Sequence, residues 1–233
     1  MDQRSRIILA ATELLEASPN GDISTRGVGE KAGLQQPVIY RLFGDKDGLL
    51  SAVADHGFGE YLAAKRAAVP TSDPVADLRR GWDDHTRFAL EHPNVYRLMY
   101  APGLASAPKS VGEAHELLRS VLERVARAGR LAIELDRAAE IVISANSGVA
   151  LALLTRPELH RSAELSVRVR DIVLAGILTP EPDAGPQPAP LGVPQAATTL
   201  AALLRSQPPE SFSPAERELL AEWLTRLAQD TRP

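Results

Sequence analysis

The sequence predicts an all-α fold. Apolar residues recur every three or four positions along almost the whole chain, the spacing of the buried face of an amphipathic helix. No segment shows the sustained alternation of apolar and polar residues that is typical of a half-buried strand. With 233 residues, the chain is long enough for each of two domains to have a hydrophobic core of its own.

Four helices are expected near the N-terminus, where turn residues separate the apolar stripes. The first ends at the turn formed by residues 18–21, and the fourth stops before Pro70. The predicted spans are 3–17, 25–32, 36–43 and 46–69.

Longer helices are expected in the middle of the chain. One begins at the Asp73-Pro74 pair, a short one opens at Pro93, and another carries the apolar stripe from Val111 to Val125. Two more are predicted at 137–154 and 163–178, the first with Asp136 as its N-cap. The helix at 137–154 is apolar around most of its circumference and must therefore be covered on most sides.

The C-terminal part of the chain has a different composition. Six prolines between positions 180 and 194 predict a linker, and the following residues predict a helical extension of two helices. The second of these, 214–229, is opened by a capping box at Ser213. Its apolar face is expected to fold back on the rest of the protein or across a dimer; the face consists of Leu219, Leu220, Trp223, Leu224 and Leu227.

Composition limits the classes of protein that the chain can belong to. Without cysteine it forms neither disulfides nor thiolate metal sites, which fits a reducing cytoplasm. A net charge of −4 argues against a general polyanion binder. No run approaches eighteen uninterrupted apolar residues, and the five histidines show no metal-ligand spacing. We expect a soluble cytoplasmic protein with no cofactor and no membrane partner.

Residues 24–43 form the most informative motif in the sequence. Ser24 can cap a first short helix, and Gly33 provides the left-handed residue that a tight turn between two helices needs. The second helix then exposes polar side chains and ends with apolar anchors at Ile39 and Phe43. Glutamine can hydrogen-bond to base edges, and tyrosine and arginine can reach phosphates. The motif therefore predicts a helix-turn-helix that binds DNA.

Over residues 5–53 the chain resembles the tetracycline-repressor (TetR) family. The resemblance is carried by Ala32-Gly33, by Tyr40-Arg-Leu-Phe43, by Lys46 and by Leu49-Leu50. It implies a dimeric regulator that binds a palindromic operator, most often as a repressor, and is released by a small molecule. The DNA-contact candidates that it implies are Thr25, Arg26, Gln35, Gln36, Pro37, Val38, Tyr40, Arg41 and Lys46.

The resemblance also implies how the chain is divided. Residues 1–48 would form the DNA-binding domain, 49–178 a larger effector-binding and dimerisation domain, 179–194 the linker and 195–233 the extension. Helices 137–154 and 163–178 would form the dimer interface or, on the residues alone, an internal core. The sparse charge of the middle domain favours an apolar or aromatic effector.

Pocket candidates come from aromatic and polar residues on the apolar stripes. For each of them a purely structural role in the core is the alternative, since a buried polar group needs a partner in either case. These candidates are Trp82, His85, Phe88, Met99, Tyr100, His115 and Asn146.

Two other classes of protein compete with a regulator. A helical-bundle enzyme is disfavoured because no nucleophile, base and orienting group occur at recognisable spacing. A protein-interaction module would use the amphipathic helix 214–229. Within the motif, Gly27 and Gly29 each cost about 0.5–1 kcal/mol of helix stability relative to alanine, so the first motif helix is expected to be soft.

Overall fold

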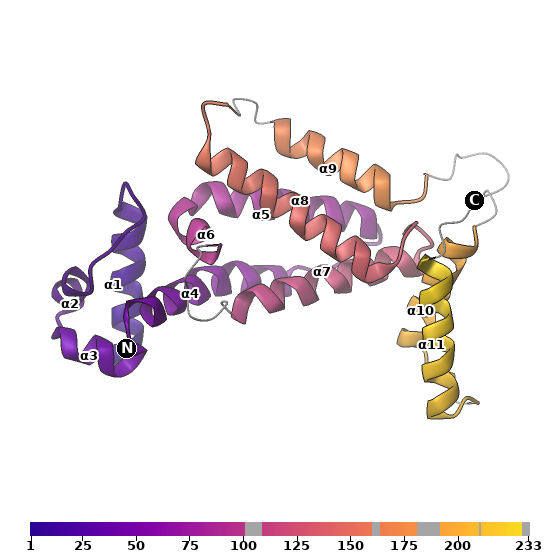
Figure 1. Cartoon of the computed structure of the whole chain (residues 1–233), viewed down its shortest axis with the longest axis horizontal. Helices are drawn as coiled ribbons and strands as arrows, with labels where there is room; N and C mark the ends of the chain where they lie inside the picture. Colours follow the sequence, from indigo (N-terminus) through magenta and orange to yellow (C-terminus); the bar gives the residue numbers. More distant parts are fainter. Residues whose placement is uncertain (101–108, 160–163, 181–191, 210, 230–233) are drawn as a thin grey trace. The chain divides into compact units, whose positions relative to one another are not determined.

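The structure is a computed structural model that describes residues 1–100, 109–159, 164–180, 192–209 and 211–229. Most of the predicted linker at 179–194 lies outside these residues. Within the described part every regular element is a helix, and the only strand-like feature is an isolated bridge between Leu131 and Leu178 (Figure 1). The prediction of an all-α fold is confirmed.

The described helices follow the predicted order closely. Their bounds are α1 (Gln3–Ala17), α2 (Thr25–Ala32), α3 (Gln36–Phe43), α4 (Lys46–Ala67), α5 (Pro74–Glu91), α6 (Pro93–Met99), α7 (Lys109–Arg127), α8 (Leu135–Thr155), α9 (Glu164–Ile177), α10 (Val193–Ser206) and α11 (Pro214–Gln229).

These helices belong to two compact units. The described residues of Met1–Ala68, His85–His115 and Ala150–Leu159 make up the first unit, and the other described residues make up the second. Because the units interleave along the chain, the domain boundaries read from the sequence stay predictions.

Helix α1 is central to the packing of the first unit. It contacts α2, α4 and α6, and α4 in turn contacts α3 and α6. The side chains of Ile7 and Leu15 on α1, and of Leu49, Val53 and Leu62 on α4, are fully buried. Burying such a side chain contributes about 1.5–3 kcal/mol, so this core positions the first three helices.

A side chain from α6 caps the C-terminal end of α1. The Asn94 amide Nδ2 donates to the carbonyl oxygens of Leu15 and Ser18, both at 2.8 Å. Arg97, one turn further along α6, donates to Asn94 Oδ1 at 3.1 Å and to the carbonyl oxygen of Leu154, near the end of α8, at 2.5 Å. Two side chains of α6 thus satisfy helix-end carbonyls of both α1 and α8.

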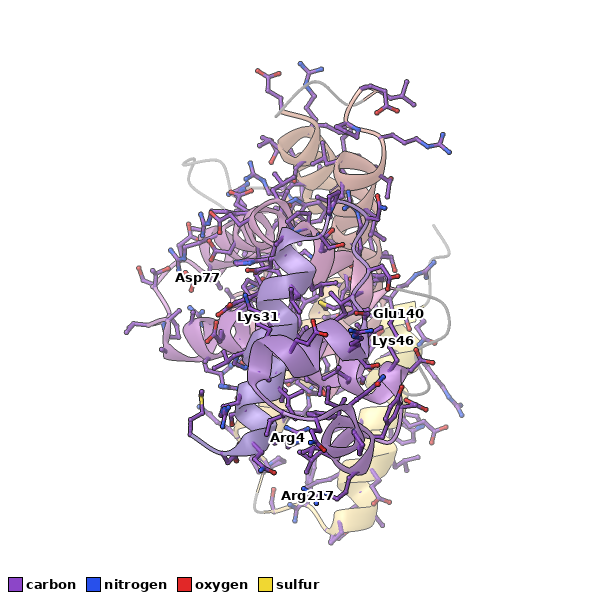
Figure 2. The ribbon with its side chains drawn as sticks, turned by 90° about the vertical axis from the view of Figure 1, so that its left-hand side faces the viewer. Arg4, Lys31, Lys46, Asp77, Glu140 and Arg217 are labelled. Carbon is purple, nitrogen blue, oxygen red and sulfur yellow. The ribbon has the colours of Figure 1, made fainter. Side chains whose placement is uncertain are left out.

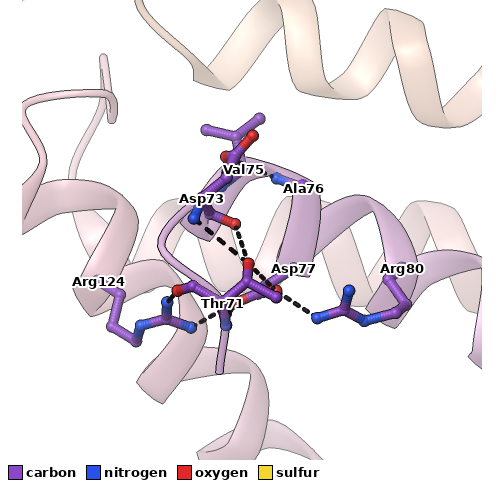
Figure 3. A network of polar contacts seen from close by, with 7 residues as sticks. All are labelled: Thr71, Asp73, Val75, Ala76, Asp77, Arg80 and Arg124. Atoms are coloured by element: carbon purple, nitrogen blue, oxygen red, sulfur yellow. Dashed lines mark hydrogen bonds and ion pairs between the residues drawn. The ribbon is translucent and has the colours of Figure 1, made fainter. Parts of the chain in front are cut away.

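In the second unit, Asp77 ties the start of α5 to α7. Its carboxylate accepts hydrogen bonds from the backbone N–H and hydroxyl of Thr71, at 3.0 and 2.7 Å, and pairs with Arg80 and Arg124 (Figure 3). Burial raises the pKa of Asp77, but the hydrogen bonds from Arg124 and Thr71 outweigh it and lower the pKa to about 2. Asp73 caps α5 beside this network, as predicted.

Replacing Asp77 by asparagine is expected to lower the free energy of unfolding at neutral pH by about 2 kcal/mol, because charge-assisted hydrogen bonds are lost. The folded-state pKa lies below the ordinary value of 3.8, so Asp77 stabilises the fold fully above about pH 4. This contribution is lost as the pH falls toward about 2.

Urea unfolding at a series of pH values measures both effects. Asp77→Asn should flatten the loss of stability between about pH 4 and pH 2. Glu140→Gln, at an exposed site on α8 (labelled in Figure 2), should leave the curve unchanged. If the free energy of unfolding of wild type and of Asp77→Asn fell equally between about pH 4 and pH 2, the stabilising role of the Asp77 carboxylate would be contradicted.

The part of α8 that belongs to the second unit is held by polar side chains as well as apolar ones. Asn146 donates to the carbonyl oxygen of Trp82 at 3.2 Å, and the Trp82 indole donates to Ser166 Oγ on α9 at 3.0 Å. The predicted cap is wrong: Glu134, and not Asp136, accepts hydrogen bonds from the backbone at the helix start, at 2.9 Å each. Asp136 instead pairs with Arg119 of α7.

By length and composition, α8 is the one helix in the described part of the chain that could span a membrane. In the structure 44% of the apolar window is buried inside the protein, and core helices of soluble proteins have the same properties. The polar contacts of Asn146 suit such a core helix.

Helices α10 and α11 form a hairpin in which only part of the predicted apolar face is covered. Leu224 and Ala228 of α11 are buried against Ala197 of α10, with Leu220 beside them. The capping box at Ser213 is confirmed, since Ser213 and Glu216 exchange hydrogen bonds at 2.8 and 3.3 Å. Within the single chain, Leu219, Trp223 and Leu227 stay exposed, so the hairpin alone does not cover the whole face, and its cover across a dimer stays a prediction.

Candidate DNA-binding site

The turn between α2 and α3 has the predicted geometry. Ser24 Oγ accepts a hydrogen bond from the Gly27 N–H at 3.0 Å and so caps α2. Gly33 ends this helix with φ 64° and ψ 37°, the left-handed conformation that glycine adopts without strain. The Leu34 N–H then donates to the Gly29 carbonyl at 2.9 Å, which closes the turn.

Gly29 has a packing role that its sequence position did not indicate. A Cβ atom at this position would lie 2.8 Å from the carbonyl oxygen of Leu34, closer than real Cβ atoms come to backbone. The glycine therefore lets α2 and the start of α3 approach each other. At Gly27 the neighbour of such an atom is only the Ser24 hydroxyl, at 3.1 Å.

The motif is held on α1 from its inner side. Val28 and Ile39 are fully buried and Ala32 nearly so, as predicted, whereas Phe43 is only half-buried. Arg6 of α1 donates to the carbonyl oxygen of Ala32 at 2.6 Å, where the negative end of the α2 dipole favours a cation. This anchoring fixes the orientation of α3.

The outer side of α3 presents most of the predicted contact residues. Gln35, Gln36, Pro37, Tyr40 and Arg41 are exposed, and Val38 is half-buried. A surface hollow of about 540 Å³ adjoins them; it is lined by Arg26, Gly29, Glu30, Gly33, Leu34, Gln35, Gln36 and Pro37. The combination of amides, a phenol and a guanidinium on one exposed helix suits both base edges and phosphates.

Three of the candidates form a hydrogen-bonded group across the turn. The Gln36 amide donates to the hydroxyl oxygens of Thr25, at 2.7 Å, and of Tyr40, at 3.3 Å. Thr25 is buried, and its hydroxyl lies 3.4 Å from that of Tyr40. The group joins α2 to α3 and holds the Gln36 side chain in place before any ligand binds.

Three cations of this region are paired with acids. Lys46 Nζ lies 2.6 Å from Asp22, Arg26 pairs with Glu30 at 2.9 Å, and Lys31 pairs with Glu13 at 2.8 Å (Lys31 and Lys46 are labelled in Figure 2). The hydrogen bond from Lys46 lowers the pKa of Asp22, so this carboxylate is ionised at neutral pH. A phosphate that binds Lys46 must therefore compete with Asp22.

The pocket candidates are divided between the two units. In the first unit, His85, Phe88 and Tyr100 belong to a cluster of rings, Met99 is buried and His115 is half-buried. In the second, Trp82 and Asn146 are engaged in the contacts between α5, α8 and α9.

The ring cluster includes aromatic residues that the sequence analysis missed. His85 Nε2 lies 2.7 Å from the hydroxyl of Tyr96, and Phe88 stacks on Tyr61 with ring centroids 4.7 Å apart. Burial, with a smaller contribution from the charge of Lys65, lowers the pKa of His85 to about 3, so its imidazole is neutral. The apolar stripe of α4, which carries Phe58 and Tyr61, was the signal that could have found them.

The fold and this site together define a helix-turn-helix protein with the DNA-binding fold of transcription regulators. A family model described as bacterial regulatory proteins, tetR family, matches residues 7–53. Over these residues the chain resembles this family, as the sequence analysis expected.

Known proteins resemble the chain over much of its length. The nucleoid occlusion factor SlmA of Marinomonas sp. (strain MWYL1) is 24% identical over 158 residues, which are 64% of this chain and 79% of that protein. A protein of unknown function from Rhodococcus sp. RHA1 is 25% identical with a TM-score of 0.64, and the match covers 77% of this chain and 97% of that one.

Two further solved proteins have the same fold at lower identity. A TetR transcription regulator from Haloarcula marismortui is 17% identical with a TM-score of 0.60, covering 76% of this chain and 99% of its own. BioQ, solved with its natural double-stranded DNA operator, is 22% identical with a TM-score of 0.54, covering 74% and 98%.

Proposed function

We propose that this protein is a ligand-responsive transcription repressor that binds a palindromic operator as a homodimer and is released by a small molecule. The observation that carries the proposal is the exposed outer side of α3, on which Gln35, Gln36, Tyr40 and Arg41 are presented by a buried scaffold. BioQ, which shares the fold, was solved on a DNA operator. A DNA-binding domain near residues 1–48 and a cytoplasmic location are parts of the same proposal.

Helices α8 and α9 are the proposed dimer interface, in line with the predicted spans 137–154 and 163–178. Both helices carry exposed apolar side chains: Ile141 on α8 is 37% exposed, and Val167 and Ile172 on α9 are 40% and 73% exposed. An isologous pairing of these faces would bury them and present two copies of α3 to successive major grooves.

The proposed effector is an apolar or aromatic molecule that binds beside the ring cluster of α4, α5 and α6. A neutral His85, hydrogen-bonded to Tyr96, suits an uncharged ligand better than an anion. Release of the operator requires that the effector bind the state that cannot bind DNA more tightly than the state that can. A tenfold loss of operator affinity needs a coupling free energy of about 1.4 kcal/mol between effector binding and DNA binding.

Removing the side chains of Tyr40 and Arg41 together is expected to weaken operator binding by about 10- to 100-fold. Each supplies a contact to DNA worth about 1 kcal/mol or more, and neither is part of the buried core. Fluorescence anisotropy with operator DNA measures the change. Arg79→Ala, which removes an exposed cation from α5, is the matched control and should bind as wild type does.

Asp22→Asn gives a test of opposite sign in the same assay. Because Asp22 holds Lys46 in an exposed ion pair, its neutralisation should free Lys46 for phosphate and strengthen binding by about two- to fivefold. Unchanged binding by the Tyr40→Ala plus Arg41→Ala variant would rule out α3 as the DNA reader. Weaker binding by Asp22→Asn would mean that the ion pair between Lys46 and Asp22 persists in the DNA complex and stabilises it.

A further inference from the structure

The hairpin of α10 and α11 carries an uncovered apolar face. On α11, Leu219, Trp223 and Leu227 are 44%, 53% and 43% exposed. On α10, Leu200 and Leu203 are 44% and 42% exposed. On each helix, the exposed stripe lies about a quarter turn around the helix axis from the residues buried between the two helices. Viewed from the N-terminus to the C-terminus of each helix, this quarter turn has the same direction in both. In an antiparallel pair, such positions lie on one side, so the five residues form one face.

The length of the linker and hairpin accounts for the share of this chain that the solved relatives do not match. The solved relatives are matched over 97% or more of their own length, but they cover at most 77% of this chain. The predicted linker and extension together are about as long as the part of this chain that the relatives do not match. The hairpin is nevertheless anchored, since Thr198 lies 3.4 Å from the carbonyl oxygen of Ile133 and Arg205 pairs with Glu123 at 3.1 Å. An anchored element that keeps a tryptophan and four leucines exposed is typical of an interaction site.

The apolar stripe on α11 is self-complementary. Leu219 and Leu227 lie one helical turn before and one turn after Trp223, so the stripe reads the same in both directions. A two-fold axis through Trp223, perpendicular to the helix, places Leu219 of one copy against Leu227 of the other. Isologous interfaces require this kind of symmetry within one surface.

The charges beside the stripe fit the same antiparallel arrangement. Glu222 and Arg226 lie on the flank of α11 that faces away from α10, where they form an exposed i,i+4 pair. Rotation about the two-fold axis leaves this flank on the same side of the contact in both copies. Glu222 of each copy then lies at nearly the same position along the helix axis as Arg226 of the other. Two reciprocal ion pairs can therefore form across the contact, and the opposed helix dipoles also favour it.

We propose that this face binds the same face of a second copy of the chain, so that two hairpins form an antiparallel four-helix bundle. This surface is separate from the proposed α8–α9 dimer interface. A chain with both surfaces assembles dimers into tetramers, which can occupy neighbouring operator sites together.

The test is sedimentation velocity of the full-length protein over a range of concentrations. Wild type should pass from dimer to tetramer, and Trp223→Glu should weaken this step by at least about tenfold, as expected for the central tryptophan of an interface. Thr225→Glu places the same charge on α11 away from the stripe and should assemble as wild type does. Trp223→Glu should still bind a single operator, which separates this proposal from the proposed function.

Charge reversal tests the antiparallel arrangement. Glu222→Arg alone should weaken the dimer-to-tetramer step, and adding Arg226→Glu should restore it, because the reciprocal pairs re-form with exchanged signs. Circular dichroism should show unchanged helix content in each variant. Failure of wild type to pass beyond the dimer, or equal assembly by Trp223→Glu and wild type, would overturn the proposal.

Discussion

Replacing Gly48 by alanine should destabilise the first unit by about 3 kcal/mol or more and abolish operator binding. Gly48 lies in the first turn of α4, where its N–H donates to the capping carboxylate of Asp45 at 2.7 Å. A Cβ atom here would lie 2.0 Å from the carbonyl oxygen of Phe43, the last residue of α3. Because that neighbour is backbone, the methyl group fits only if α3 moves away from α4.

Urea unfolding followed by circular dichroism, with operator binding measured in parallel, checks this expectation. Gly59→Ala is the matched control, since it adds a methyl group to the same helix where a Cβ atom meets nothing within 4 Å. It should stabilise the protein by up to about 1 kcal/mol through helix propensity. If both variants unfold at the urea concentration of wild type or above it, the close approach at Gly48 is not required.

Replacing Asn94 by alanine is expected to cost about 2–4 kcal/mol, because two carbonyl oxygens at the end of α1 lose their donor. The amide is buried and makes both contacts at 2.8 Å, so water does not readily replace it. Operator affinity should fall as well, since the contact between α6 and α1 helps to orient the helix on which α2 and α3 pack.

Thermal unfolding and DNA binding of Asn94→Ala and Asn20→Ala distinguish the capping role of Asn94 from the general effect of removing an asparagine side chain. Asn20→Ala removes the same side chain from an exposed position near the end of α1 and should change stability by less than about 0.5 kcal/mol. A similar, small change in both variants would show that the capping contacts of Asn94 contribute little. Arg97→Gln should fall between them, because it removes the hydrogen bonds to Leu154 and to Asn94 Oδ1 but leaves the Asn94 amide that caps α1.

Local signals in the sequence were enough to predict the helices and the turn of the motif. Ser24 and Gly33 act at neighbouring backbone groups, so their roles depend only on residues a few positions away. The Asp73 cap and the Ser213 capping box were predictable for the same reason. At the start of α8, both Glu134 and Asp136 could act as the N-cap. In the structure Glu134 caps the helix, while Asp136 pairs with Arg119.

Contacts between distant segments could not be read from the pattern. Gly29 was predicted only to weaken its helix, and no local signal marked Gly48, but each allows a close approach of backbone that only three-dimensional packing creates. The aromatic partners of His85, and the ion pair between Lys46 and Asp22, join residues that are 11 and 24 positions apart. For the hairpin, amphipathic spacing identified the apolar face of α11 but not which half of it α10 covers.

The pairing of Arg26 and Lys46 with acids has a consequence for how binding responds to ionic strength. Added salt screens attraction between a cation and DNA phosphate, and it also screens the internal pair that the phosphate must displace. The two effects oppose each other, whereas an unpaired cation would experience only the first. Operator recognition by such a surface should therefore tolerate changes in cellular ion content better than its number of lysines and arginines suggests.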